Sequence, residues 1–327
     1  MKHLLNLLAA IALLVWGTQL VRTGILRVFG ANLRHVLARS ISNRYTAALS
    51  GIGVTAMVQS STATALIISA FVAQGLVTLP LALAVMLGAD IGTSLMAVVF
   101  SFDLSWLSPL FIFVGVLLFI SRQSSPAGRF GRVLIGLGLM LLALRLVGEA
   151  TSVLTKAPAI KTLLASLSSD LMLEIFVGAL LSVVSYSSLV IVLLTATLAA
   201  TGVVPLDVAL GLVLGANLGS GVLAVLTTAR APVEAREVPL GNLVFKILGV
   251  LIAMPLIAVW LKYARPYLGE VTTVVVMFHL CFNIMVALIF ISLTGRIARM
   301  VAHWLPKPEK ILVAGRPHRH QGTAAPR

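Results

Sequence analysis

The stretch Gly51–Val98 reads GIGVTAMVQSSTATALIISAFVAQGLVTLPLALAVMLGADIGTSLMAV and returns, without a gap, 127 residues later at Gly178–Val225. Sixteen of the 48 paired positions are identical, whereas a composition this biased gives roughly five matches by chance. Shared serines and glycines weigh most, because leucine and alanine pair by accident in an apolar chain. The chain is therefore organised around an internal repeat.

Composition sets the fold class. Of the 327 residues, 59% are hydrophobic and only 10% are charged, and the mean hydropathy is +1.08. A soluble domain carries about a quarter charged residues. Backbone groups in lipid must be satisfied inside helices or closed barrels, and the long apolar runs do not alternate as barrel strands would. The sequence predicts an all-α polytopic membrane protein.

The first run, Leu4–Val21, lacks a clear cleavage site and is taken as a mature helix, not a signal peptide.

About seven full spans and two further apolar stretches are expected. The spans are predicted near 4–21, 80–100, 107–120, 133–148, 206–227, 239–261 and 271–293. The two further stretches, 47–75 and 172–202, carry clusters of Ser, Thr and Gly at their middles, which lipid-facing helices seldom do. We interpret them as re-entrant hairpins or broken helices covered by protein or a water-filled cavity.

Charge and crossing number predict how the repeat is oriented. Three crossings separate equivalent points, so the second copy should enter the membrane from the opposite side. Seventeen Lys/Arg lie in the loops 22–44, 121–132 and 228–238 and in the tail after Thr294. Five lie on the other side: Lys2, Lys156, Lys161, Lys262 and Arg265. Since cytoplasmic loops are rich in Lys and Arg, the first group is placed in the cytoplasm. The protein is expected in the inner membrane of the cell, crossing it several times.

The predicted organisation has four parts. The first inverted repeat covers 1–120 and the second covers 121–261, each with one serine-rich hairpin. A final transmembrane helix covers 262–295, and a basic, disordered cytoplasmic tail covers 296–327. Inverted repeats with interrupted segments at matching positions are typical of secondary transporters, with the substrate site near the midplane between the copies.

Paired serines mark the two hairpins. The first contains Q-S-S-T-A-T, starting at Gln59, and its counterpart is Y-S-S, starting at Tyr186. Hydroxyl groups can donate to an oxyanion or ligate a hard cation, and a helix start there would offer free N–H groups to an anion. The structural alternative is that small hydroxyl residues let helices pack closely, bonded back to their own turn. Equivalent pairs in both copies favour a site.

A second repeated motif contains an intramembrane carboxylate. G-A-D-I-G-T-S, from Gly88 to Ser94, matches G-A-N-L-G-S-G, from Gly215 to Gly221. Gly-x-x-x-Gly alone indicates only close helix contact. Asp90 and its counterpart Asn217 make the motif a functional candidate, because an ionisable residue in an apolar segment is costly.

Twin serine-rich hairpins, each followed by a G-A-N-I-G-T-T-like element, resemble the sodium-dependent phosphate cotransporter family, the type II Na/Pi cotransporters and their bacterial members. The resemblance covers most of residues 1–295. It implies sodium-coupled transport of inorganic phosphate, with the two serine motifs contributing to the substrate and ion sites; no cofactor is expected. Carried over by position, these residues are Gln59, Ser60, Ser61, Thr62, Ser187 and Ser188. The repeated element adds Asp90, Thr93, Asn217 and Ser220 as candidate substrate or ion ligands. Bacterial relatives often continue into a soluble helical regulatory domain, which this chain is expected to lack.

The sequence departs from the family pattern at three positions. Tyr186 replaces a glutamine, Gly221 replaces a hydroxyl residue, and Asp90 stands where asparagine is usual. Asp90 could be a sodium ligand, a proton carrier, or a structural acid bonded to a hydroxyl such as that of Thr93; the sodium role is preferred, since carboxylate oxygen suits a hard cation. Because Asn217 occupies the equivalent position, Asp90→Asn is not expected to unfold the protein.

The remaining polar residues are given structural roles. His279 begins H-L-C-F-N, a recurrent family element whose degenerate relative is N-L-V-F-K, ending at Lys246. His279 is expected to be hydrogen-bonded structure and Lys246 to snorkel to the cytoplasmic interface. Cys281 is expected to be a small buried side chain. Three acidic residues are expected near the outer face and solvated: Glu149, Asp170 and Glu174.

Phosphate carried with sodium is the function favoured over two alternatives. One is a sodium-coupled transporter of another anion such as a dicarboxylate; the other is a non-transporting membrane sensor or scaffold. An enzyme is not expected, because the sequence shows no intramembrane nucleophile–base set, metal-ligand cluster or P-loop. The net charge of +14 lies in loops and the tail, which indicates membrane orientation and not nucleic-acid binding.

Overall fold

The computed structural model describes residues 2–122, 125–154 and 170–305. All regular structure in these ranges is helical. The longer helices are α1 (Lys2–Ser40), α2 (Arg44–Val58), α3 (Ser61–Ala73), α4 (Leu79–Ser101), α5 (Ser108–Ser121), α6 (Pro126–Leu154), α8 (Leu171–Val184), α9 (Ser188–Ala200), α10 (Leu206–Thr228), α11 (Val233–Ala253), α14 (Val271–Phe290) and α15 (Thr294–Trp304). Short turns η1 (Ser105–Leu107), α12 (Leu256–Val259), η2 (Trp260–Ala264), α13 (Arg265–Leu268) and η3 (Ile291–Leu293) connect them.

Five helices in the described part of the chain are long and apolar enough to cross a membrane. These are α1, α4, α6, α10 and the stretch Val271–Trp304 that starts with α14. Counting α11 with α12 and α13, across a bend of 57°, gives six. The predicted seven spans are not reached, because α5, in place of the span near 107–120, has 14 residues and a spanning helix needs about 20.

Two predicted non-helical regions are helical. The proposed loop 22–44 is largely absent, because α1 runs without a break to Ser40. It is held on α6, where Gly17 faces the Gly136 carbonyl so closely that a Cβ would lie 2.8 Å from its oxygen. The predicted disordered tail 296–327 is helical to Trp304, because Ile297 and Val301 are buried on one face of α15. The later tail residues, and Lys156 and Lys161, lie outside the described residues.

The repeat in sequence is a repeat in backbone geometry. We call α2–α4 (44–101) the first matching segment and α8–α10 (171–228) the second. The boundaries of α3 and α9, and of α4 and α10, differ by 127 residues at both ends. Gln59 and Tyr186 both adopt the left-handed conformation, with φ of 57° and 56°, and Gly75 and Gly202 both have φ of 71°. The helix breaks therefore fall at equivalent positions.

Repeated glycines explain how each segment packs. α2 lies against α4, and α8 lies against α10. A Cβ added to Gly51 or Gly88 would overlap a backbone carbonyl of the facing helix, and the same holds for Gly178 and Gly215. Only glycine permits this approach, so these shared residues fix the helix pairs.

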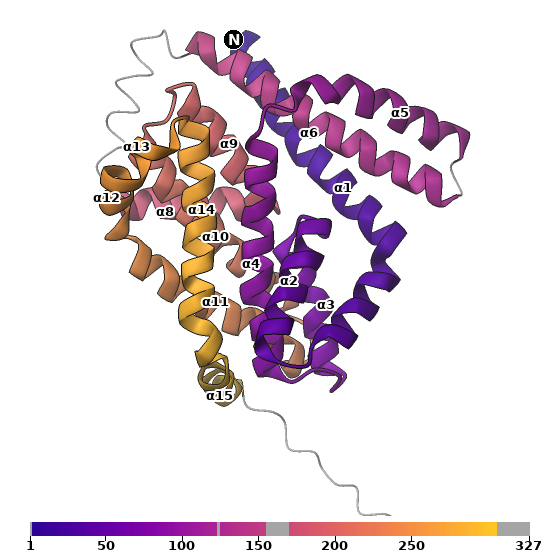
Figure 1. Ribbon diagram of the computed structural model, residues 1–327, viewed down its shortest axis with the longest axis vertical. Helices are drawn as coiled ribbons and strands as arrows, with labels where there is room; N and C mark the ends of the chain where they lie inside the picture. The colour runs from indigo at the N-terminus through magenta and orange to yellow at the C-terminus, as the bar shows by residue number, and fades with distance from the viewer. Residues whose placement is uncertain (1, 123–124, 155–169, 306–327) are drawn as a thin grey trace, which may run out of the picture.

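The short helices connect the two segments. α3 packs against α10 and α11, whereas α9 packs against α4 and α14. In Figure 1, α2 and α3 lie in the lower half of the molecule and α8 and α9 in the upper half, with α4 and α14 running between them. Each short helix thus contacts the long helix of the other segment, which brings the two motifs toward a shared centre.

Candidate functional site

The helix breaks place the paired serines at helix starts. Gln59 ends α2 and Ser60 is the extended residue that caps α3, its hydroxyl accepting from the Ala63 N–H at 3.2 Å. In the second matching segment Ser187 caps α9 in the same way, accepting from the Val190 N–H at 3.3 Å. Serine forms strong N-caps because its hydroxyl replaces a missing helix acceptor, so the sequence itself positions both breaks.

These caps leave groups that can bind a ligand. A capping hydroxyl uses an acceptor site and keeps its own proton for donation, while the first N–H groups of a helix attract anions. Ser60, Ser61, Ser187 and Ser188 are all buried, and Thr62 is half-buried in the first turn of α3. Gln59 is also buried, and its Oε1 has no hydrogen-bond partner among the described residues. The first break therefore holds donors and an unused oxygen.

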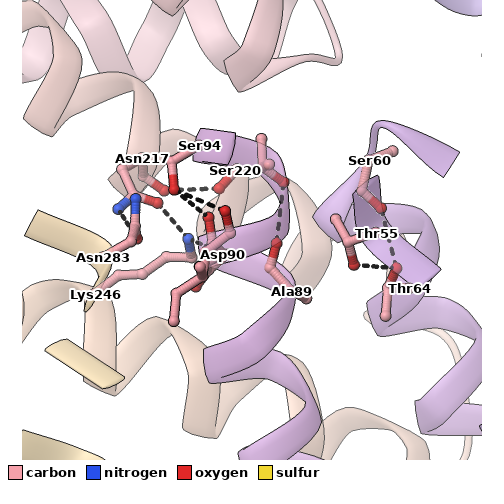
Figure 2. A network of polar contacts seen from close by, with 12 residues as sticks. Thr55, Ser60, Thr64, Ala89, Asp90, Ser94, Asn217, Ser220, Lys246 and Asn283 are labelled. Atoms are coloured by element: carbon pink, nitrogen blue, oxygen red, sulfur yellow. Dashed lines mark hydrogen bonds and ion pairs between the residues drawn. The ribbon is translucent and has the colours of Figure 1, made fainter. Parts of the chain in front are cut away.

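A buried polar network lies beside the first break. Lys246 Nζ on α11 lies 2.8 Å from Asp90 Oδ1 on α4 and 2.5 Å from Asn217 Oδ1 on α10. Asn217 Nδ2 donates to Asn283 Oδ1 on α14 at 2.9 Å, and Asn283 Nδ2 donates to the His279 carbonyl at 3.0 Å. Figure 2 shows Lys246 reaching between the side chains of Asp90 and Asn217. The repeated Asp90 and Asn217 are thus joined through one ammonium group.

The network touches the first hairpin directly. The side chains of Ser61 and Asn242 lie beside the Asp90 carboxylate. Beside it, Thr55 and Thr64 share a hydrogen bond of 2.7 Å across the break, visible at the right of Figure 2. Ser61, at the start of α3, therefore belongs both to the serine motif and to the shell around Asp90.

Two of the predicted hydroxyls point elsewhere. Thr93 Oγ1 donates to the Ala89 carbonyl at 3.2 Å, and Ser220 Oγ donates to the Asn217 carbonyl at 2.7 Å. Each is bonded to its own helix, as small hydroxyl residues in apolar helices often are. The structure does not show the hydrogen bond between Asp90 and Thr93 on which the structural-acid alternative was based.

Lys246 was expected to snorkel, and this prediction was wrong. Its side chain is 2% exposed, because Asp90 supplies the charge that a buried ammonium requires. His279, expected to be hydrogen-bonded, is buried with an Nδ1 that has no partner among the described residues. Cys281, expected to be buried, is exposed on α14.

Of the three acidic residues expected to be solvated, Glu174 differs from expectation. Glu149 is exposed and pairs with Arg145 at 3.4 Å, as a solvated residue would. Glu174, in contrast, is only 7% exposed and packs against α10. Burial raises its pKa to about 7, and the neighbouring carboxylates of Asp207 and Asp170 contribute to the shift. Asp170 itself caps α8, accepting from the Met172 and Leu173 N–H groups.

Arg22 is a candidate that the sequence interpretation missed. Its Nη2 donates to the Tyr186 carbonyl at 3.0 Å, and its Nε is buried without a partner among the described residues. The guanidinium therefore lies at the second helix break, one residue from Ser187, with a free donor. Its charge was assigned to a loop because the predicted span ended at residue 21; its position inside an uninterrupted apolar helix is the signal that could have identified it.

Comparison with known proteins gives one consistent family. The sequence model described as "Na+/Pi-cotransporter" matches residues 13–149 and 151–288. Proteins of Escherichia coli K12 and Salmonella typhimurium named for inorganic phosphate export, YjbB, are 50% identical over 299 residues, 91% of this chain. The chain spans 55% of the length of those relatives. YqeW of Bacillus subtilis is 23% identical over 309 residues, 94% of this chain and 99% of its own. No solved structure matches the chain.

Proposed function

The chain belongs to the Na+/Pi-cotransporter family, and from this we propose that it is a multi-pass inner-membrane transporter that moves inorganic phosphate together with sodium. The observation that carries the proposal is the pair of serine-capped helix starts at equivalent positions of the two matching segments, with the capping residues Ser60 and Ser187 both buried. Family membership disfavours the sensor or scaffold alternative and an enzyme.

In this proposal the helix starts of α3 and α9 bind phosphate. The hydroxyls of Ser60, Ser61, Ser187 and Ser188 donate to phosphate oxygens, and the first helical N–H groups add partial positive charge without a counterion. Arg22, whose Nε at the second break has no partner within the described ranges, supplies a full positive charge of the type that favours phosphate.

Oxygen atoms near the same centre suit a cation. Gln59 Oε1 is buried and has no hydrogen-bond partner among the described residues, and the hydroxyl of Thr62, in the first turn of α3, is a further oxygen of the kind that hard cations prefer. Asp90 also needs a positive charge, because a buried carboxylate must be compensated. In the arrangement described here the compensating group is the Lys246 ammonium.

We further propose that the two matching segments are inverted repeats with re-entrant hairpins α2–α3 and α8–α9. The equal breaks and the placement of the hairpins toward opposite ends in Figure 1 support this. Cysteines replacing Arg129 and Lys262, in a Cys281→Ala background, should react with an impermeant thiol reagent from opposite sides of the membrane. Labelling from one side only would contradict the inverted arrangement.

Transport is tested in proteoliposomes. Labelled phosphate flux should respond to a sodium gradient, and it should be measured in both directions because the family is described by cotransport whereas the YjbB proteins are named for export. Flux should persist in excess succinate; strong inhibition by succinate with weak inhibition by unlabelled phosphate would instead indicate a dicarboxylate carrier.

Serine variants locate the site. Ser60→Ala and Ser187→Ala should each weaken phosphate binding by about 1.5–3 kcal/mol, the value of a hydrogen bond to a charged group, which is roughly ten- to a hundredfold in affinity. Ser121→Ala is the matched control, because that exposed hydroxyl bonds only to the Leu117 carbonyl. Wild-type flux in both site variants would remove the site from these motifs.

A further inference from the structure

The buried network contains two pairs at corresponding places. Asp90 on α4 pairs with Lys246 on α11, and Asn217 on α10 pairs with Asn283 on α14. Asp90 and Asn217 are equivalent by the 127-residue offset, and Lys246 and Asn283 are the last residues of the related N-L-V-F-K and H-L-C-F-N elements. One pair consists of two amides, while the other consists of a carboxylate and an ammonium.

The two pairs differ in what they need. The amide pair is neutral: Asn217 and Asn283 share one hydrogen bond of 2.9 Å, and their remaining groups bond to Lys246 Nζ and to the His279 carbonyl. A carboxylate in the same surroundings needs a cation or a proton. The Lys246 ammonium lies between Asp90 Oδ1 and Asn217 Oδ1, at 2.8 and 2.5 Å. Two side-chain oxygens, one from each matching segment, thus converge on a single monovalent positive charge, and Ser61 and Asn242 lie beside the Asp90 carboxylate.

Carboxylate, amide and hydroxyl oxygens are ligands of hard metal cations. They are equally acceptors for an ammonium, which is a compact charge with three donors. We propose that the Lys246 ammonium is a tethered cation: it occupies a monovalent-cation site formed by Asp90 and Asn217, and a free sodium ion takes that site when the ammonium is removed. With Lys246 in this site, each transport cycle carries one coupling cation fewer than it would carry if residue 246 were neutral and a free cation filled the site. This second statement rests on the proposed function; the first does not.

Binding is tested without phosphate. The thermal stability of the purified protein is titrated with sodium chloride, against choline chloride at equal ionic strength. Lys246→Met should gain a sodium-specific stabilisation of several degrees that is absent from the wild type, because anything that binds only the folded state stabilises it. The double variant Asp90→Asn/Lys246→Asn, which copies the amide pair, should lose this gain. Lys262→Met, at an exposed lysine, should match the wild type.

Each result decides the inference. Isolation of folded Lys246→Met only in sodium supports it, since sodium then replaces the missing ammonium. A Lys246→Met titration that superimposes on that of the wild type overturns it, as does a variant that is equally unfolded in both salts. Weaker phosphate binding without any gain in sodium response also overturns it, and would make Lys246 a phosphate ligand.

Flux separates this inference from the proposed function. In proteoliposomes, phosphate flux by Lys246→Met should depend on sodium more steeply than wild-type flux, with an apparent order higher by about one, as mass action requires for one more bound ion. Wild-type protein that carries no phosphate would refute the proposed function while leaving the salt titration valid. Equal steepness in the two proteins would refute the tethered cation in transport.

Discussion

Removing the Asp90 charge should destabilise the protein through its partner. Asp90→Asn leaves the Lys246 ammonium buried at 2% exposure without a counter-charge, keeping only the Asn217 oxygen and the new amide oxygen as acceptors. Breaking a buried ion pair by removing one partner costs about 3–5 kcal/mol. Because Lys246 keeps an acceptor, we expect about 3 kcal/mol, which lowers the ratio of folded to unfolded protein roughly a hundredfold.

The measurement is a double-mutant cycle in detergent micelles. Denaturant unfolding gives the free energy of unfolding for Asp90→Asn, for Lys246→Asn and for the double variant. The double variant carries two amides, as Asn217 and Asn283 do, and should recover most of the loss. A coupling energy of at least about 2 kcal/mol is expected, at the upper part of the range for contacting residues. Asp103→Asn, at an exposed carboxylate, is the control.

One outcome would refute this reasoning. If Asp90→Asn alone stayed within about 0.5 kcal/mol of the wild type, as surface substitutions do, the ammonium would not depend on Asp90. From the sequence alone, Asp90→Asn was expected not to unfold the protein, because Asn217 shows that an amide fits the equivalent position. Lys246 is the reason to expect otherwise.

Three further predictions concern other parts of the molecule. Arg22→Gln should raise the phosphate concentration needed for half-maximal flux at least tenfold, because it removes the charge and free Nε beside the second helix break; an unchanged concentration dependence would exclude Arg22 from the site. Gly88→Ala should destabilise by about 1–3 kcal/mol, the usual cost of overpacking, because its Cβ would overlap the Ala48 carbonyl, whereas Gly53→Ala, with open space around it, should be neutral or stabilising. Glu174→Gln should raise the free energy of unfolding above pH 7. The pKa of the wild-type carboxylate is raised from its ordinary value of 4.5 to about 7 in the folded protein, so wild-type stability falls as the pH rises from 4.5 through 7. The difference between variant and wild type should vanish below about pH 4.5, and a pH-independent difference would show that Glu174 does not titrate in this way.

The sequence predicted the local features that depend on residue type alone. The paired serines indicated helix starts at equivalent positions, and the Gly-x-x-x-Gly spacing indicated close helix contact; both follow from short-range sterics and hydrogen bonding. Because the two copies carry the same residues, their common breaks at Gln59 and Tyr186 could be predicted without any knowledge of how the copies pack.

Features that depend on distant partners could not be predicted in this way. Lys246 is 156 positions from Asp90 and looks like an interfacial lysine until α4 and α11 are placed together. Arg22 was assigned to a loop because hydropathy falls after residue 21, although packing on α6 keeps α1 helical. Glu174 was assigned to solvent for its charge, but its position facing Gly211 buries it. In each case tertiary packing overrides a pattern that holds only along the chain.

A cation that belongs to the chain has consequences for energy conversion. A sodium ion moving inward down a tenfold gradient contributes about 1.4 kcal/mol, and a membrane potential of 100 mV adds about 2.3 kcal/mol per charge. A lysine returns to its starting state every cycle and so contributes neither term. Each cation replaced by the ammonium of Lys246 therefore withdraws nearly 4 kcal/mol of driving force, or almost three orders of magnitude in the phosphate ratio that the carrier can sustain. If Lys246 replaces a coupling cation as proposed, the carrier would work closer to the equilibrium of phosphate itself, and a smaller change in the phosphate gradient would reverse its net direction.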